Sequence, residues 1–315
     1  MRFRLSSPLE VSDGMRHGAA LAVLGFVATL ATPASADERY RAEVQKWREA
    51  REARLTADGG WLTVAGLFWL KEGPNRFGTD SSADIVLPEG SAPARTGSFT
   101  FASGRTTLRL AKGVEGAIDG RPVTGPRSMQ PDTSGKPEIL EMGSLTMYVI
   151  ERGGRFGIRL KDNSSAVRRD FAGLSWFPID EVYRIEARWV SYPAPRPLKV
   201  PNVLGETTTM PSPGHAEFEL DGQIVRLDGV LEDPQSLELF FILRDQTSGE
   251  STYGAGRFLY SGLPKQGRVV LDFNKAYNPP CAFTPFATCP LPPKQNWLPV
   301  AVEAGEMAYG DSTAH

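Results

Sequence analysis

Residues 145–160, Leu-Thr-Met-Tyr-Val-Ile-Glu-Arg-Gly-Gly-Arg-Phe-Gly-Ile-Arg-Leu, decide the fold class of this chain. Residues 145–150 and 156–160 are two short runs rich in β-branched, aromatic and other apolar side chains, as strands are. Arg152-Gly153-Gly154-Arg155 lies between them and supplies the glycines that a tight turn needs. The segment therefore predicts a β-hairpin.

The rest of the chain repeats this pattern of short strands and turns. Residues 97–110 and 183–190 alternate apolar and polar side chains, which is typical of half-buried strands. Further strands are expected in the C-terminal part, at residues 217–220, 223–231, 238–244, 253–260 and 268–273. The 32 glycines and 25 prolines favour many short strands over helices. We predict an all-β protein with antiparallel sheets.

One helix is predicted, at residues 37–55. Its larger side chains recur at a spacing of 3.6 residues along a narrow face. Asp37 and Glu38 lie at its start, where negative charge interacts favourably with the helix dipole. We expect this amphipathic helix to pack on the β core and to leave most of its charged side chains in solvent.

The N-terminus has the pattern of a secretory signal peptide. Met15-Arg16-His17 begins a basic segment, and residues 19–30 follow without a charge. Pro33 then precedes Ala34-Ser35-Ala36, an A-x-A cleavage pattern. The apolar run is shorter than the roughly 20 residues that span a bilayer. We predict cleavage after Ala36 and a periplasmic or secreted protein.

The remaining chain is divided into three parts, namely the helix at 37–57, a β-sandwich at 58–165 and a C-terminal β domain at 166–310. The C-terminal domain is expected to be a second antiparallel β-sandwich or a barrel. Six prolines between Pro193 and Pro213 predict an extended crossover, because proline cannot donate to a sheet ladder. His215 follows in a segment that predicts an exposed turn leading into a strand.

Composition argues against several classes of function. The formal net charge is −2 and no basic block stands out, so nucleic-acid binding has no electrostatic support. Of the three histidines, only His215 lies in the body of the chain, which argues against a metal site. No cofactor and, after cleavage, no membrane span are expected.

Residues 66–150 resemble a forkhead-associated (FHA) sandwich. The resemblance rests on residues 76–88 (Arg-Phe-Gly-Thr-Asp-Ser-Ser-Ala-Asp-Ile-Val-Leu-Pro), 116–123 (Gly-Ala-Ile-Asp-Gly-Arg-Pro-Val) and 143–149 (Gly-Ser-Leu-Thr-Met-Tyr-Val). The family reads phosphothreonine with an Arg directly after the glycine, but here Thr79 follows Gly78. Without that charged donor, the resemblance implies the fold and not phosphopeptide binding.

A second resemblance covers residues 45–306. It rests on Gly60-Trp61-Leu62, on residues 66–70 and 252–258 (Gly-Leu-Phe-Trp-Leu and Thr-Tyr-Gly-Ala-Gly-Arg-Phe), on residues 271–293, and on Ala304-Gly305-Glu306. These segments resemble the family of bacterial proteins of unknown function named DUF1684. The resemblance implies no activity.

Cys281 and Cys289 are the two cysteines of the chain and lie in a proline-rich segment. In an oxidising compartment, two cysteines this close predict a disulfide. The alternative is a reactive thiolate at Cys281, which would need a nearby base or cation, such as Arg257, to lower its pKa.

Polar and aromatic residues around these cysteines predict a pocket in the C-terminal β domain. A few convergent polar groups between aromatic walls are typical of small-molecule or glycan sites. The predicted ligand-binding residues are Trp176, Tyr253, Arg257, Asn274, Tyr277 and Asn278. The alternative for the polar residues at strand ends is a structural role, with Arg257 as a buried partner of Asp245 or Asp272. We expect a binding protein; the alternatives are a hydrolase that uses Asp245 and Asp272, a thiol enzyme that uses Cys281, and a scaffold without a ligand.

Overall fold

The computed structural model describes residues 35–310. The predicted signal peptide, residues 1–36, therefore lies almost entirely outside the described residues. Helix α1 (Ala36–Thr56) confirms the predicted helix. Its buried side chains, Val44, Arg48, Arg51 and Leu55, follow one another at intervals of four, three and four residues and so share a face. Two of them are arginines, which need polar partners below the helix.

The N-terminal half is a sandwich of two sheets. The strands of the first sheet, in spatial order, are β1 (Val64–Trp69), β11 (Arg155–Asp162), β10 (Leu145–Arg152), β9 (Leu140–Met142), β6 (Ala117–Ile118) and β7 (Arg121–Pro122). Those of the second are β3 (Ile85–Val86), β2 (Gly73–Gly78), β4 (Gly97–Ala102), β5 (Arg105–Leu110) and β8 (Arg127–Met129). Side chains of both sheets form one core, with Phe99 and Leu108 from the second packed with Leu145, Val149 and Ile158 from the first.

The hairpin predicted from residues 145–160 is confirmed. β10 and β11 pair antiparallel from Leu145 opposite Asp162 to Arg152 opposite Arg155, with Gly153 and Gly154 at the turn. Both glycines have positive φ angles, of 54° and 77°, which other residues adopt at a cost.

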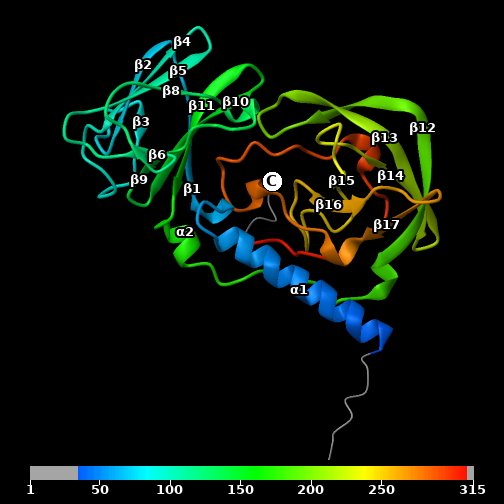
Figure 1. The fold of residues 1–315 in the computed structure, drawn as a ribbon. Helices are drawn as coiled ribbons and strands as arrows, with labels where there is room; N and C mark the ends of the chain where they lie inside the picture. The colour runs from blue at the N-terminus through cyan, green and yellow to red at the C-terminus, as the bar shows by residue number, and fades with distance from the viewer. Residues whose placement is uncertain (1–34, 311–315) are drawn as a thin grey trace, which may run out of the picture. The chain divides into compact units, whose positions relative to one another are not determined.

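The C-terminal half contains two antiparallel sheets (Figure 1). The larger has the order β14 (Gln223–Gly229), β13 (Thr207–Leu220), β12 (Arg184–Pro201) and β17 (Arg268–Asp272). The smaller pairs β15 (Glu238–Leu243) with β16 (Arg257–Gly262). Trp189 and Leu227 of the larger sheet share a core with Phe241 and Leu259 of the smaller one. The chain is therefore all-β apart from α1 and short helical turns, as predicted.

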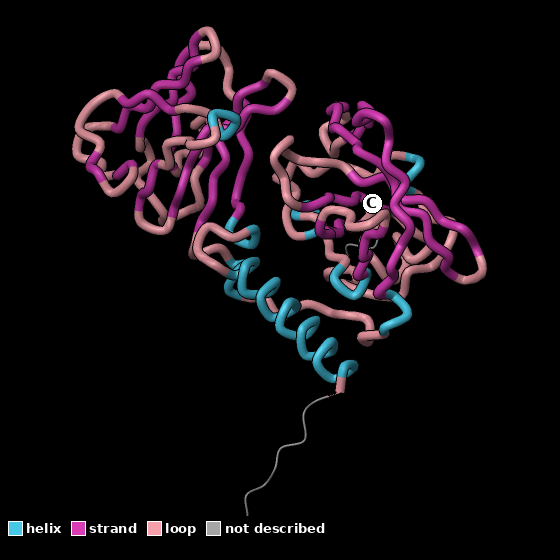
Figure 2. Tube along the Cα trace, turned by 45° about the vertical axis from the view of Figure 1, so that its right-hand side comes forward, coloured by secondary structure: helices cyan, strands magenta, loops and turns pink. Residues whose placement is uncertain are grey.

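The remaining helices are short and lie in the connections between the longer elements or after β17, the last strand (Figure 2). They are η1 (Trp61–Thr63), η2 (Asp132–Ser134), α2 (Ala166–Arg169), η3 (Glu181–Tyr183), η4 (Phe273–Lys275), η5 (Pro280–Ala282) and η6 (Lys294–Asn296).

The prediction for the proline-dense stretch was wrong. β12 and β13 pair along most of residues 184–220 as a long hairpin instead of an extended crossover. The ladder is interrupted between Ser191 and Arg196, which accommodates Pro193 and Pro195, and Pro197 lies opposite Pro211. Prolines fit a ladder where their missing N–H would point away from the partner strand.

The prediction for His215 was also wrong. The residue lies within β13 and is 8% exposed. One ring nitrogen is 3.1 Å from the Tyr192 hydroxyl and the other 3.2 Å from Glu217 Oε1. These partners satisfy both nitrogens, so the ring has a structural environment.

Candidate functional site

A cavity of about 1090 Å³ lies in the C-terminal half, and we call it the C-terminal cavity. Its lining comes from the end of β12, the β12–β13 turn, the residues after β15 and a loop at residues 279–293, the proline loop. The lining residues are Lys199, Pro201, Val203, Leu204, Thr207, Arg244, Tyr253, Gly254, Ala255, Cys281, Ala282, Phe283, Thr284, Pro285, Ala287, Leu291, Pro292, Pro293, Lys294, Gln295 and Trp297.

The proline loop is held against the β12–β13 turn by backbone hydrogen bonds. Leu291 N donates to Pro201 O at 2.7 Å, and Val203 N donates to Cys289 O at 3.1 Å. Asn202 forms an isolated bridge with Pro290. Prolines restrict the loop further because their φ is fixed. One wall of the cavity is thus preformed.

Two buried positions fix the opposite wall. Asn296, 1% exposed, donates from Nδ2 to Asp228 O and Ile242 O, both at 3.0 Å, and accepts from Asp228 N at 2.9 Å. Gly256 has a φ of 96°, and a Cβ there would lie 2.4 Å from Leu243 O. The segment around Gly256 therefore tolerates no side chain at that position.

Arg244 and Trp297 form a pair on this wall. The Arg244 guanidinium carbon lies 5.1 Å from the centre of the Trp297 ring, within the range of a cation–π contact. Trp297 Nε1 donates to Pro292 O at 3.1 Å, yet the residue is 50% exposed. An indole that is both anchored and half-exposed offers a flat apolar surface to a ligand.

Tyr253, Cys281 and Cys289 lie together at another part of the cavity. A hydrogen bond from the Cys289 thiol, with a further one from the Tyr253 hydroxyl, lowers the pKa of Cys281. Burial, followed by the hydrogen bond with Cys281, raises the pKa of Tyr253, and the same sulfur contact raises the pKa of Cys289. Cys281 is therefore the more acidic of the two thiols.

The structure does not contain the expected disulfide. Cys281 and Cys289 are both free, and the backbone N–H of Cys281 donates to Cys289 Sγ at 3.2 Å. Their sulfurs are hydrogen-bonded neighbours and not at bonding distance.

Arg257 and Asp245 form a buried ion pair outside the cavity lining. Both side chains are 0% exposed, and Arg257 Nη2 lies 2.9 Å from Asp245 Oδ2. Arg257 also donates to the carbonyls of Val302 and Ala304, while Asp245 Oδ1 accepts from the backbone and hydroxyl of Thr247. The pair fixes the C-terminal segment against β15 and β16, which explains why an Arg occupies this core position.

Asp272 and Asn274 lie together under the N-terminal part of α1. Tyr40 donates to Asp272 Oδ1 at 2.8 Å, and Lys275 Nζ lies 3.2 Å from Asp272 Oδ2. Asn274 Nδ2 donates to the Tyr40 hydroxyl at 2.9 Å, and Asn274 Oδ1 accepts from Asp180 N at 3.0 Å. These contacts attach the helix to the end of β17.

Trp176, Tyr277 and Asn278 surround the middle of α1. The rings of Trp176 and Tyr277 lie 5.9 and 6.2 Å from that of Trp47, at ring centroids. Asn278 O accepts from Arg51 Nη2 at 2.9 Å. Tyr277 also lines a second, smaller cavity of about 460 Å³, together with Trp47 and Arg51.

Of the predicted site residues, the structure brings Tyr253 and Cys281 into the C-terminal cavity. The others have the partners described above, and their roles in ligand binding stay predictions. Sequence reasoning missed Lys199, Arg244 and Trp297. A signal was present for Trp297. This large aromatic residue follows two prolines and the polar stretch Lys294-Gln295-Asn296, and a Trp in such a polar loop indicates a contact surface.

Within residues 35–310, no three His, Cys, Asp or Glu side chains lie close enough together to hold a metal ion. The lining itself offers one thiol and no carboxylate or imidazole.

Comparison with known proteins places the chain in a family. Residues 169–307 match the sequence model of a family described as protein of unknown function (DUF1684). An uncharacterized protein of Haloarcula marismortui, solved by NMR, is 35% identical over 44% of this chain and 78% of its own, with a TM-score of 0.38. The chain belongs to the DUF1684 family. The match covers every residue that lines the C-terminal cavity of this DUF1684 protein.

Structural neighbours of this DUF1684 protein also include FHA domains. One is the FhaA FHA domain, and another comes from a study of phosphothreonine-dependent FHA interactions. Each is 14% identical, covers 30% of this chain and has a TM-score of 0.22, with 97% and 92% of its own length matched. No functionally curated protein matches the sequence.

The helices of residues 35–310 differ from membrane-spanning helices in length or in apolar character. None of them combines sufficient length with sufficient apolar character to cross a bilayer.

Proposed function

We propose that this DUF1684 protein binds a small molecule in its C-terminal cavity. The observation that carries the proposal is the cavity itself, because its volume of about 1090 Å³ lies just above the range of ligand sites, roughly 300–1,000 Å³, and can hold a small molecule. Its walls combine apolar side chains, such as Val203, Leu204 and Leu291, with a few polar groups. Preformed walls also reduce the entropy lost on binding.

Binding is better supported than catalysis. A thiol enzyme needs a base beside its nucleophile, and the lining around Cys281 contains no His, Asp or Glu. The hydrolase alternative needs two carboxylates at one site. Asp245 is paired with Arg257 in the core, and Asp272 contacts Tyr40 under α1, so neither lines the cavity.

A compact apolar ligand is better supported than a glycan. Sugar hydroxyls are bound by carboxylates and amides, and Gln295 is the one such side chain in the lining. Trp297 and Phe283 instead offer ring surfaces to an apolar group.

The test uses N-phenyl-1-naphthylamine, a neutral apolar molecule whose fluorescence rises when it leaves water. We expect saturable binding by the whole protein. Leu204→Trp fills the cavity from the half-buried β12–β13 turn and should weaken binding at least about tenfold, because a filled site cannot accept the probe without strain.

Leu237→Trp is the matched control. Leu237 is 80% exposed and does not line the cavity, so the same substitution there should leave binding unchanged. Equal melting temperatures of the two variants establish that both are folded. Binding that is equal in Leu204→Trp and wild type would place the probe elsewhere and overturn the proposal.

We also propose that the protein acts outside the cytoplasm. The support is the sequence pattern at residues 15–36, a basic start, an uncharged apolar run and Ala34-Ser35-Ala36. N-terminal sequencing of the exported protein should begin at Asp37. A protein that keeps residues 15–36 and stays in the cytoplasm would contradict this assignment.

A further inference from the structure

The charged residues of the C-terminal cavity all have the same sign. They are Lys199, Arg244 and Lys294, and no Asp or Glu lines the cavity. Among the described residues none of these three side chains has an ion-pair partner. Two acidic residues are direct sequence neighbours of lining residues, and both have other partners: Glu206 is paired with Arg155 at 3.0 Å and Asp245 with Arg257 at 2.9 Å. Positive charge at this site is therefore not neutralised by the protein.

Arg244 is held in place by its backbone and by Trp297. Arg244 N donates to Asn296 O at 3.1 Å, and Leu298 N donates to Arg244 O at 2.7 Å. The guanidinium rests on the indole ring and has no hydrogen-bond acceptor among the described side chains. A positioned guanidinium with unused donors can bind a carboxylate or similar anion through two hydrogen bonds.

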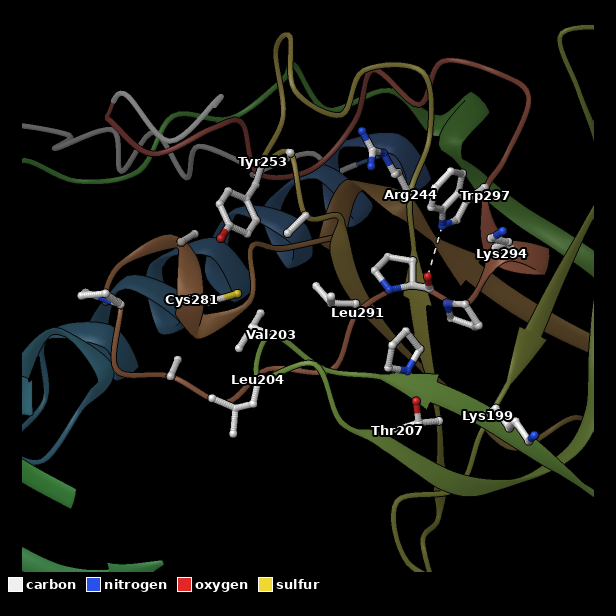
Figure 3. Close-up of a pocket in the computed structure, with 18 of the residues that line it drawn as sticks. Lys199, Val203, Leu204, Thr207, Arg244, Tyr253, Cys281, Leu291, Lys294 and Trp297 are labelled. Atoms are coloured by element: carbon white, nitrogen blue, oxygen red, sulfur yellow. Dashed lines mark hydrogen bonds between the residues drawn. The ribbon is translucent and has the colours of Figure 1, made fainter. Parts of the chain in front are cut away.

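The charged and apolar parts of the lining are separated in space. Figure 3 shows the cationic side of the cavity at Arg244, Trp297, Lys294 and Lys199, and the other side at Tyr253, Cys281, Val203 and Leu204. Leu291 lies between the two. A ligand that fits both sides has an anionic head and an apolar body.

We propose that the cavity binds an amphipathic organic anion, an alkyl or aryl carboxylate whose head lies at Lys199, Arg244 and Lys294. The apolar body lies along Leu291 toward Val203 and Leu204. This inference rests on the proposed function, because it names the class of ligand for the same cavity. Because its charge is complementary to the cationic side, an anionic ligand is favoured over neutral and cationic ligands of the same size.

The experiment uses three ligands with the same ten-carbon chain and different heads, namely decanoate, decanol and decyltrimethylammonium. Each ligand is added to the whole protein with bound N-phenyl-1-naphthylamine, at concentrations below the critical micelle concentration of that ligand. The loss of probe fluorescence measures displacement. Decanoate should bind at least about tenfold more tightly than decanol, since a charge-assisted hydrogen bond is stronger than a neutral one. Decyltrimethylammonium should bind most weakly.

Two variants test the residues. Arg244→Gln and Lys294→Gln should each weaken decanoate about three- to tenfold and leave decanol unchanged. Lys294 is exposed, so its substitution leaves folding intact even if Arg244→Gln does not. Lys112→Gln, an exposed lysine of the N-terminal sandwich that does not line the cavity, is the control and should change neither affinity.

The outcomes separate this inference from the proposed function. If decanol or decyltrimethylammonium displaces the probe as well as decanoate does, the cavity binds ligands but the anion inference is overturned. If decanoate is preferred and Lys294→Gln and Arg244→Gln remove the preference, the inference is supported. If the probe itself does not bind, both proposals fail.

Discussion

Glu306 is a fully buried carboxylate that has a single ion-pair partner. Its Oε2 lies 3.3 Å from Arg51 Nε, and its Oε1 has no hydrogen-bond partner. Burial raises the pKa of Glu306 to about 7, against the partial compensation of Arg51. The carboxyl therefore exchanges its proton near neutral pH.

Glu306→Gln should remove a pH-dependent part of the stability. Because the folded pKa is about 7 and the ordinary value is 4.5, the native state holds the proton more tightly than the unfolded state. The stabilisation that comes from this tighter proton binding is complete below pH 4.5 and is lost as the pH rises through 7. The difference between wild type and Glu306→Gln in the free energy of unfolding should thus fall by about 3 kcal/mol between pH 4.5 and 8.

Urea unfolding of both proteins across this range measures the difference. Glu250→Gln, at an exposed turn, is the control and should show the pH dependence of wild type. A difference between wild type and Glu306→Gln that stays constant from pH 4.5 to 8 would show that folding does not raise the pKa of Glu306.

At the same scale, the sequence predicted only part of the candidate site. Tyr253 and Cys281 were found because they lie in distinctive segments with aromatic and proline neighbours. For Arg257 the sequence left two alternatives, the pocket or a buried pair with Asp245 or Asp272, and in the structure it pairs with Asp245 in the core. Whether an Arg between apolar neighbours faces a cavity or a buried partner depends on residues 45 or more positions away, Val302 and Ala304.

Among the elements, α1 and the hairpin of β10 and β11 were predicted well. Each is specified by local periodicity and by the turn residues beside it. The long hairpin of β12 and β13 was not, because its prolines were counted without their positions in the ladder. A break between Ser191 and Arg196 and a facing proline pair let both strands continue. Register, and not composition, decides whether a proline can be tolerated.

The sequence predicted that α1 packs on a β core, but not which residues attach it there. Its buried arginines find specific partners that no local pattern contains. Arg51 contacts Glu306 and the ring of Tyr277, whose centre lies 4.6 Å from the guanidinium carbon, and Arg48 donates to Phe177 O at 3.0 Å. The helix is thus attached through its arginines to residues that lie 129 to 255 positions further along the chain.

For the molecule as a whole, the all-β class followed from composition and alternation, and the cavity did not. Its walls come from the end of β12, the residues after β15 and the proline loop, and the cations Lys199, Arg244 and Lys294 are far apart along the chain. Only tertiary structure brings them to one side of the cavity. The same assembly places a half-buried thiol, Cys281, at the other side.

The alkylation rate of Cys281 tests the central claim, that the C-terminal cavity binds a ligand. The reduced protein is treated with iodoacetamide with and without decanoate, and the labelled peptide is quantified by mass spectrometry. Decanoate at ten times its Kd should slow alkylation of Cys281 about tenfold, since only the unoccupied fraction reacts. An unchanged rate, while decanoate still displaces the fluorescent probe, would show that the ligand binds outside this cavity and would contradict the account.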